Sequence, residues 1–117
     1  MPVTDAGIGI LATGGAWTAK TNIWFSTFSG MHSDHYSQSR DDGSAWDIDT
    51  IAVRGRAWRN DDLKMDETDT QEDSADAQIE KVVCSSFYCG GDWKARGDHT
   101  FEESGYMSWY PITEDTW

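Results

Sequence analysis

The sequence predicts an all-β protein: an antiparallel β-sandwich of about eight short strands with long polar loops and little or no helix. The chain has 117 residues, the usual size of a single domain, so one domain is expected to span 1–117. Short alternating apolar segments recur with turn residues between them. Fifteen Asp, seven Trp and eleven Gly against six Glu favour turns and strands over helices.

The first half of the chain supplies two of these strand patterns. Residues 7–13 alternate Ile with Gly, and residues 22–29 (NIWFSTFS) give the strongest strand pattern in the chain. Because residues 22–29 carry no charge, this strand is a candidate unprotected sheet edge. Residues 31–47 are polar and rich in turn residues, with Asp42-Gly43 as a hairpin dipeptide. Residues 48–54 predict the next strand.

The second half is organised around a stretch of acidic residues. Residues 62–68 alternate as a strand does, residues 69–76 are expected to form an acidic loop, and residues 78–84 predict a further strand. The remainder is expected to be irregular apart from strands near 99–102 and 106–110. No internal repeat or linker divides the chain.

Charge and motifs limit the function classes. A formal charge of −12 disfavours nucleic acid as a partner, because nucleic-acid affinity comes from Lys and Arg at phosphates. The motifs of serine hydrolases, phosphate-binding loops, dinucleotide binding and zinc proteases are absent from the sequence, which makes an enzyme a minority interpretation. Carboxylate pairs for a small hydrolase exist, but 21 acidic residues make such pairs uninformative.

The acidic stretch offers a candidate cation site. Calcium takes six to eight oxygen ligands from flexible loops. We therefore consider Asp66, Asp69, Asp73 and Asp76 as candidate Ca²⁺ ligands, with Ca²⁺ as a possible cofactor. The spacing does not match the helix–loop–helix calcium motif. A solvated acidic face is the alternative, and the sequence favours it.

Tryptophans next to turn residues offer a candidate ligand surface. Trp17, Trp46 and Trp58 could dock a sugar or a lipid interface, or could cover the core ends of a small sandwich. Arg56, beside Trp58, could hold an anionic group, although pairing with a nearby Asp is the commoner role of such an arginine.

Histidines and cysteines give weaker signals. His32 and His35 would point to opposite faces of a strand, so they are interpreted as surface residues, as is His99. Cys84 and Cys89 are spaced for a disulfide across a tight loop, but two reduced thiols would give the same pattern. The start of the chain lacks the features of a signal peptide, yet the composition favours an extracellular or surface-associated protein.

Several segments follow the order of elements in a known module. Thr13–Asn22 lead into Ile23-Trp24-Phe25 and end at Gly30, and the later segments 46–53, 62–65 and 77–83 follow in matching order. Over residues 6–85 the chain resembles the PLAT domain, the β-sandwich module attached to lipoxygenases and pancreatic-type lipases. Residues 86–117 do not map onto that family.

The resemblance implies an eight-stranded sandwich with loops that dock on lipid or protein, sometimes with loop-bound Ca²⁺. Together with the residue patterns, it predicts a non-catalytic module that docks on a membrane or carbohydrate surface through loop aromatics, with possible help from Ca²⁺. The alternative is a structural, self-assembling subunit (a homo-oligomer) of an extracellular or particle assembly.

Overall fold

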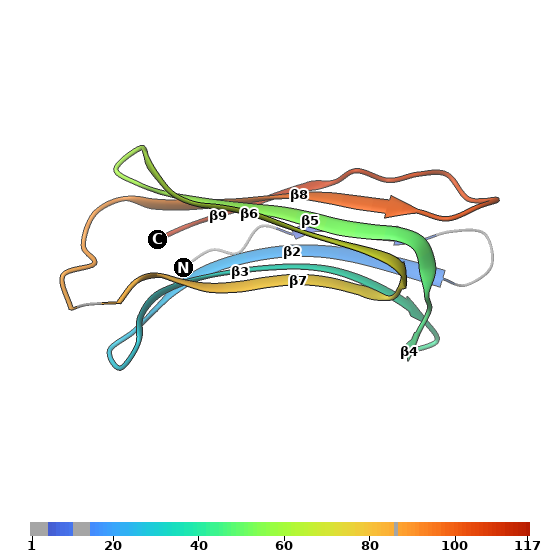
Figure 1. Cartoon of the computed structure of the whole chain (residues 1–117), viewed down its shortest axis with the longest axis horizontal. Coiled ribbons are helices and arrows are strands. Elements are labelled where there is room, and N and C mark those ends of the chain that lie inside the picture. Colours follow the sequence, from blue (N-terminus) through green and yellow to red (C-terminus); the bar gives the residue numbers. More distant parts are fainter. Residues whose placement is uncertain (1–4, 11–14, 86) are drawn as a thin grey trace.

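The computed structural model describes residues 5–10, 15–85 and 87–117. Two antiparallel sheets pack face to face as a β-sandwich, which confirms the predicted fold class (Figure 1). The described residues contain eight strands of five or more residues and one two-residue strand, with no helix. Among them, no helix is long and apolar enough to cross a membrane. The molecule is elongated, with extents of 48 × 24 × 23 Å.

The first sheet has β2 and β3 at its centre. β1 pairs with β2, β2 pairs with β3, and β3 pairs with both β7 and the short β4. The strands of this sheet are β1 (Asp5–Ile10), β2 (Gly15–Ser26), β3 (Gly30–Asp41), β4 (Ser44–Ala45) and β7 (Asp76–Cys84).

The second sheet has the order β6-β5-β8-β9. Its strands are β5 (Ile48–Arg59), β6 (Asp62–Ser74), β8 (Trp93–Glu102) and β9 (Ile112–Thr116). In β8 every second side chain or glycine, from Trp93 to Phe101, is buried, and the residues between them face outward. This period of two places one face of the strand on the core.

Two apolar clusters fill the ends of the sandwich interior. The larger one surrounds Trp17, whose ring stacks on Phe101 at 5.3 Å and on Trp46 at 5.9 Å between ring centroids. The smaller one surrounds Ile23 and Trp93. Polar side chains occupy the interior between these clusters, as described below.

Two expectations about individual elements, the acidic loop at 69–76 and the strand near 106–110, were wrong. Residues 69–74 continue strand β6 instead of forming an acidic loop, because β5 pairs with β6 along its whole length to Ser74. Strand β1 pairs with β2 only at residues 16–20, so within the described residues the uncharged end of β2, residues 22–26, pairs with β3 alone, and the predicted sheet edge is not contradicted there. Residues 106–110 form only an isolated bridge from Trp109 to Phe101, and no named strand covers them.

Residues 31–47 also differ from the expectation of a mainly turn-rich segment. Residues 30–41 are one continuous strand, β3. The hairpin dipeptide is confirmed: Asp42 and Gly43 both have positive φ and connect β3 to β4 as a two-residue loop.

Candidate functional site

Three aromatic side chains project from neighbouring loops at one end of the sandwich. Phe28, on the β2–β3 turn, is 98% exposed, and Phe87 and Tyr88, on the β7–β8 loop, are 79% and 87% exposed. The two loops line a shared hollow of about 290 Å³. We call these three residues the aromatic end; both loops lie at the left of Figure 1.

The loops of the aromatic end come from segments without charge. Residues 21–33 and 82–91 contain no Asp, Glu, Lys or Arg, although 26% of the whole chain is charged. Pairing of Met31 with Cys84 in the first sheet brings these two segments together. The result is a pair of adjacent uncharged segments on a strongly acidic protein.

Residues 88–90 of the β7–β8 loop are braced by a disulfide and by Arg59. A disulfide joins Cys84 to Cys89 at the start of the loop. Arg59 donates hydrogen bonds from Nε to the Gly90 carbonyl at 2.7 Å and from Nη2 to the Tyr88 carbonyl at 2.8 Å. These contacts hold the backbone of residues 88–90, while the Phe87 and Tyr88 side chains are exposed.

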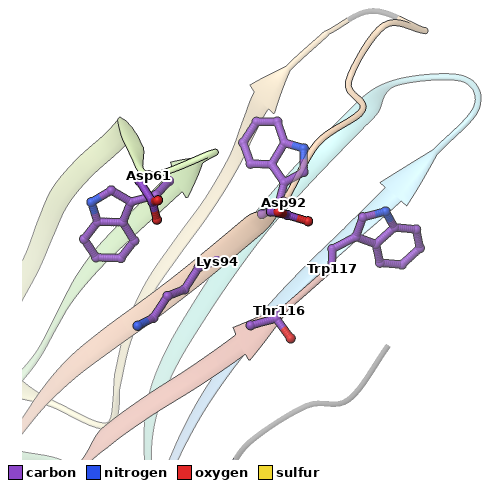
Figure 2. Close-up of a pocket in the computed structure, with 7 residues that line it drawn as sticks. Asp61, Asp92, Lys94, Thr116 and Trp117 are labelled. Atoms are coloured by element: carbon purple, nitrogen blue, oxygen red, sulfur yellow. The ribbon is translucent and has the colours of Figure 1, made fainter.

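A second hollow, of about 530 Å³, opens on the outer face of the second sheet near the same end. Figure 2 shows Asp61 and Trp117 on opposite sides of it, with Asp92 and Lys94 between them. We call this hollow the tryptophan groove; it is lined by Trp58, Asp61, Asp92, Trp93, Lys94, Thr116 and Trp117.

The polar interior contains two buried histidines, one from each sheet. His35, on β3, is completely buried. Its Nδ1 lies 3.0 Å from Thr21 Oγ1, and its Nε2 lies 2.7 Å from Ser33 Oγ. Burial, and then the charge that His99 would carry, lower the pKa of His35 to about 4.

His99, on β8, continues the same network from the opposite sheet. Its Nε2 lies 2.8 Å from Thr113 Oγ1, which is 2.5 Å from Thr21 Oγ1, and its Nδ1 lies 2.8 Å from Ser37 Oγ. Burial lowers the pKa of His99 to about 4, against a smaller opposing effect of Asp98. The surface assignment of these histidines was wrong for His35 and His99, whereas His32 faces outward on the same strand as His35.

Two glycines make room for this network. A Cβ on Gly55 would come within 2.5 Å of His35 Cδ2, and a Cβ on Gly97 would come within 2.5 Å of Thr21 Oγ1. These positions therefore need glycine so that the buried imidazole and hydroxyl groups fit between the sheets.

The sequence-predicted aromatic residues lie far apart. Trp17 is fully buried, so it has no ring face for an external ligand, and Trp46 packs against it, partly buried. Trp58 lines the tryptophan groove, which lies near the aromatic end and at the opposite end of the molecule from Trp17. Arg56 lies 5.5 Å from the Trp58 ring centroid and forms an ion pair with Asp98 at 2.7 Å. Of the three tryptophans, only Trp58 therefore belongs to a candidate surface site.

The predicted calcium ligands lie along two strands and do not converge. Asp66 forms an ion pair with Arg54 at 2.7 Å, which lowers the pKa of Asp66, and Asp76 forms one with Arg40 at 2.7 Å. Asp69 Oδ2 accepts a hydrogen bond from the Gln78 backbone N–H, and Asp73 is exposed near the end of β6. Within the described ranges, no group of three or more His, Cys, Asp or Glu is placed to hold a metal ion.

The aromatic end itself was missed by the sequence reasoning. Phe28 was placed inside a strand pattern, and Phe87 and Tyr88 fell in a segment without predicted structure. The available signal was the absence of charge from both segments, the second of which contains the Cys pair.

The fold and these features define a small, disulfide-bonded β-sandwich with exposed aromatic side chains on two uncharged loop segments at one end. No protein-family model, curated protein or solved structure matches the chain. The relation to the PLAT domain therefore stays a prediction.

Proposed function

We propose that this protein is a non-catalytic binding module that docks on a neutral lipid surface through its aromatic end. The observation that carries the proposal is the meeting of two charge-free segments that expose Phe28, Phe87 and Tyr88 side by side. Neighbouring exposed aromatics on braced loops are costly in water unless a partner covers them.

The chemistry of the three side chains favours lipid as that partner. Phenylalanine has no hydrogen-bonding group, and tyrosine combines an apolar ring with a polar tip suited to a membrane interface. Burying one such side chain in an apolar phase gains about 1.5–3 kcal/mol. Three together provide reversible, shallow attachment without any need for a spanning segment.

The charge of the protein selects the kind of lipid. A chain of formal charge −12 is repelled by anionic headgroups, so the module is expected to prefer neutral membranes. The Cys84–Cys89 disulfide supports an oxidising location, outside the cytosol or on a cell surface.

The test is flotation of the protein with phosphatidylcholine vesicles. We expect the wild-type protein to float with the vesicles, and Phe28→Ser and Phe87→Ser each to weaken binding at least tenfold, from the lower limit of about 1.5 kcal/mol per side chain. Met107→Ser is the matched control, because Met107 is 81% exposed but lies on the β8–β9 connection at the opposite end (Figure 1). Equal flotation of all variants would overturn the proposal.

Calcium assistance is tested in the same assay. Parallel samples in Ca²⁺ and in excess chelator separate cation-dependent from purely apolar docking. Because the candidate carboxylates Asp66 and Asp76 pair with arginines, we expect flotation to persist in chelator.

The assembly alternative has less support. Asp115 on β9, 2% exposed, accepts a hydrogen bond at 2.9 Å from the backbone N–H of Ile23 on β2. An inward carboxylate at this position occupies a backbone donor that a neighbouring strand would need. Sedimentation velocity over a wide concentration range tests this alternative: a single monomeric species is expected, and concentration-dependent oligomers would favour assembly.

A further inference from the structure

The tryptophan groove combines groups that attract a soft organic cation. Trp117 is 50% exposed at its rim and Trp58 forms another part of the lining, whereas the Trp93 ring is 2% exposed and belongs to the core beneath the groove. Aromatic faces attract cations through the negative charge density of the ring, and they suit quaternary ammonium groups in particular. Two of these rings already lie near guanidinium groups: Arg56 is 5.5 Å from the Trp58 centroid and Arg59 is 5.6 Å from the Trp93 centroid.

Two carboxylates add negative charge to the groove. Asp61 and Asp92 both line it, and Figure 2 shows them on adjacent walls. Over the described ranges, neither carboxylate is in any of the ion pairs of this protein, which involve other acidic residues. Their charges are therefore left for a ligand or for solvent.

The groove also contains a positively charged side chain and a hydroxyl group. Lys94 and Thr116 can each donate a hydrogen bond to an anionic oxygen. The Lys94 ammonium has a loose contact with Glu114, 3.4 Å away, and both side chains are about half exposed. A ligand with a cation and an anion a few bonds apart would thus meet complementary groups.

The walls of the groove are fixed before any ligand arrives. The Asn60 backbone N–H donates to the Asp92 carbonyl at 2.8 Å, and Asn60 Oδ1 accepts from the Asp92 N–H at 2.9 Å. Gly91, with φ of +120°, packs against the Asn60 side chain, where a Cβ would clash. Trp93 and Trp117 are joined by reciprocal backbone hydrogen bonds of 3.0 and 3.3 Å. A preorganised site binds without a large ordering cost.

We propose that the tryptophan groove binds the phosphocholine headgroup of a neutral lipid. The trimethylammonium group lies next to Asp92, between Asp61 on one side of the groove and Trp117 on the other, and the phosphate faces Lys94 and Thr116. This inference rests on the proposed lipid docking, since the groove and the aromatic end occupy the same end of the molecule. The ligand is neutral as a whole, which fits a protein that repels anionic surfaces.

The first experiment measures binding of soluble phosphocholine to the full chain by calorimetry and intrinsic tryptophan fluorescence. Phosphocholine is expected to bind at least tenfold more tightly than choline chloride or inorganic phosphate, because each of those ligands satisfies only half of the groove. Asp61→Asn and Trp117→Leu should each weaken binding at least fivefold. Asp62→Asn, at a neighbouring exposed carboxylate that does not line the groove, is the matched control and should bind as the wild type does.

The second experiment separates the headgroup from the bilayer. Vesicles of phosphatidylcholine are compared with vesicles of digalactosyl diacylglycerol, which is neutral but lacks phosphocholine. We expect stronger flotation with phosphatidylcholine, and loss of that preference in Asp61→Asn. Equal flotation with both lipids and no response to soluble phosphocholine would overturn the groove assignment while leaving the lipid docking intact. Stronger binding to the galactolipid would also overturn it and would indicate a saccharide ligand.

Discussion

Acid should destabilise this protein through its two buried histidines, His35 and His99. The pKa of a histidine in the unfolded chain is about 6.5, whereas burial lowers the pKa of both His35 and His99 to about 4. Protons therefore bind the unfolded state more tightly. Stability is complete above pH 6.5 and is lost as the pH falls towards 4.

The size of the effect follows from the two pKa values. At pH 5 the unfolded chain is almost fully protonated at these positions while the folded protein is not. The loss of unfolding free energy is then about 2 kcal/mol per histidine, or about 4 kcal/mol for both. That is a large fraction of the stability of a small domain, which is about 5–15 kcal/mol.

Other charged groups near the network act in a different range or direction. Burial raises the pKa of Asp115, which faces the same interior from β9, so protonation of Asp115 favours the folded state and opposes the histidines. The pKa of Asp98 is held below its ordinary value by hydrogen bonds and charge from Arg96 and Arg56, which outweigh its partial burial, so its contribution is lost only below about pH 4. Between pH 7 and 5 the histidines dominate.

The assay is urea unfolding followed by tryptophan fluorescence at pH 7, 6 and 5. The wild-type protein should lose about 4 kcal/mol across this range. The double variant His35→Gln/His99→Gln should be less stable at pH 7, because it disturbs buried hydrogen bonds, but nearly independent of pH. His32→Gln, at an outward-facing histidine of the same strand, should keep the wild-type slope. A wild-type protein of constant stability from pH 7 to 5, or a double variant with an unchanged slope, would refute the reasoning.

Three further predictions concern stability and are checked by thermal and urea unfolding. Gly55→Ala should cost about 1–3 kcal/mol, because its Cβ would lie 2.5 Å from His35 Cδ2; a neutral effect would show that the sheets can separate freely. Replacing both Cys84 and Cys89 by Ala should cost about 2 kcal/mol, as expected for a short closed loop, and unchanged stability would contradict the bracing role. Trp17→Ala should cost about 3–5 kcal/mol by opening a cavity in the core, and a smaller loss would show that the core collapses around the vacancy.

The sandwich was predictable wherever one strand face was apolar. Strand β8 and the hairpin at Asp42-Gly43 follow ordinary patterns of alternation and turn chemistry. Strand β3 was not predictable in this way, because its buried face carries Ser33, His35, Ser37 and Ser39. A strand with a polar inner face looks like a loop in the sequence, and only its pairing with β2 and β7 distinguishes it.

The second half of strand β6 was predicted as a loop for a different reason. Met65 is its one buried side chain within the described residues, so the strand owes its conformation to backbone pairing with β5 and not to its own side chains. Exposed carboxylates such as Glu72 are compatible with an outer strand in solvent. Acidity alone therefore did not distinguish a strand from a loop.

The candidate site was only partly predictable. Aromatic residues were predicted to form the ligand surface, but the sequence does not say which rings the sheets will cover. Trp17 and Phe28 both lie in segments of alternating character, yet one is fully buried and the other is 98% exposed. The difference depends on strand pairing: Trp17 lies inside the β2–β3 ladder, whereas Phe28 lies on the turn that closes this hairpin between Ser26 and Gly30.

Hydrogen exchange of backbone amides, with and without phosphatidylcholine vesicles, tests the central claim most directly. If the aromatic end docks on lipid, peptides containing residues 27–30 and 87–91 will exchange more slowly on vesicles, and the opposite connection at 103–111 will be unaffected. Slowing confined to 103–111, or no slowing anywhere while the protein still floats with vesicles, would contradict the account.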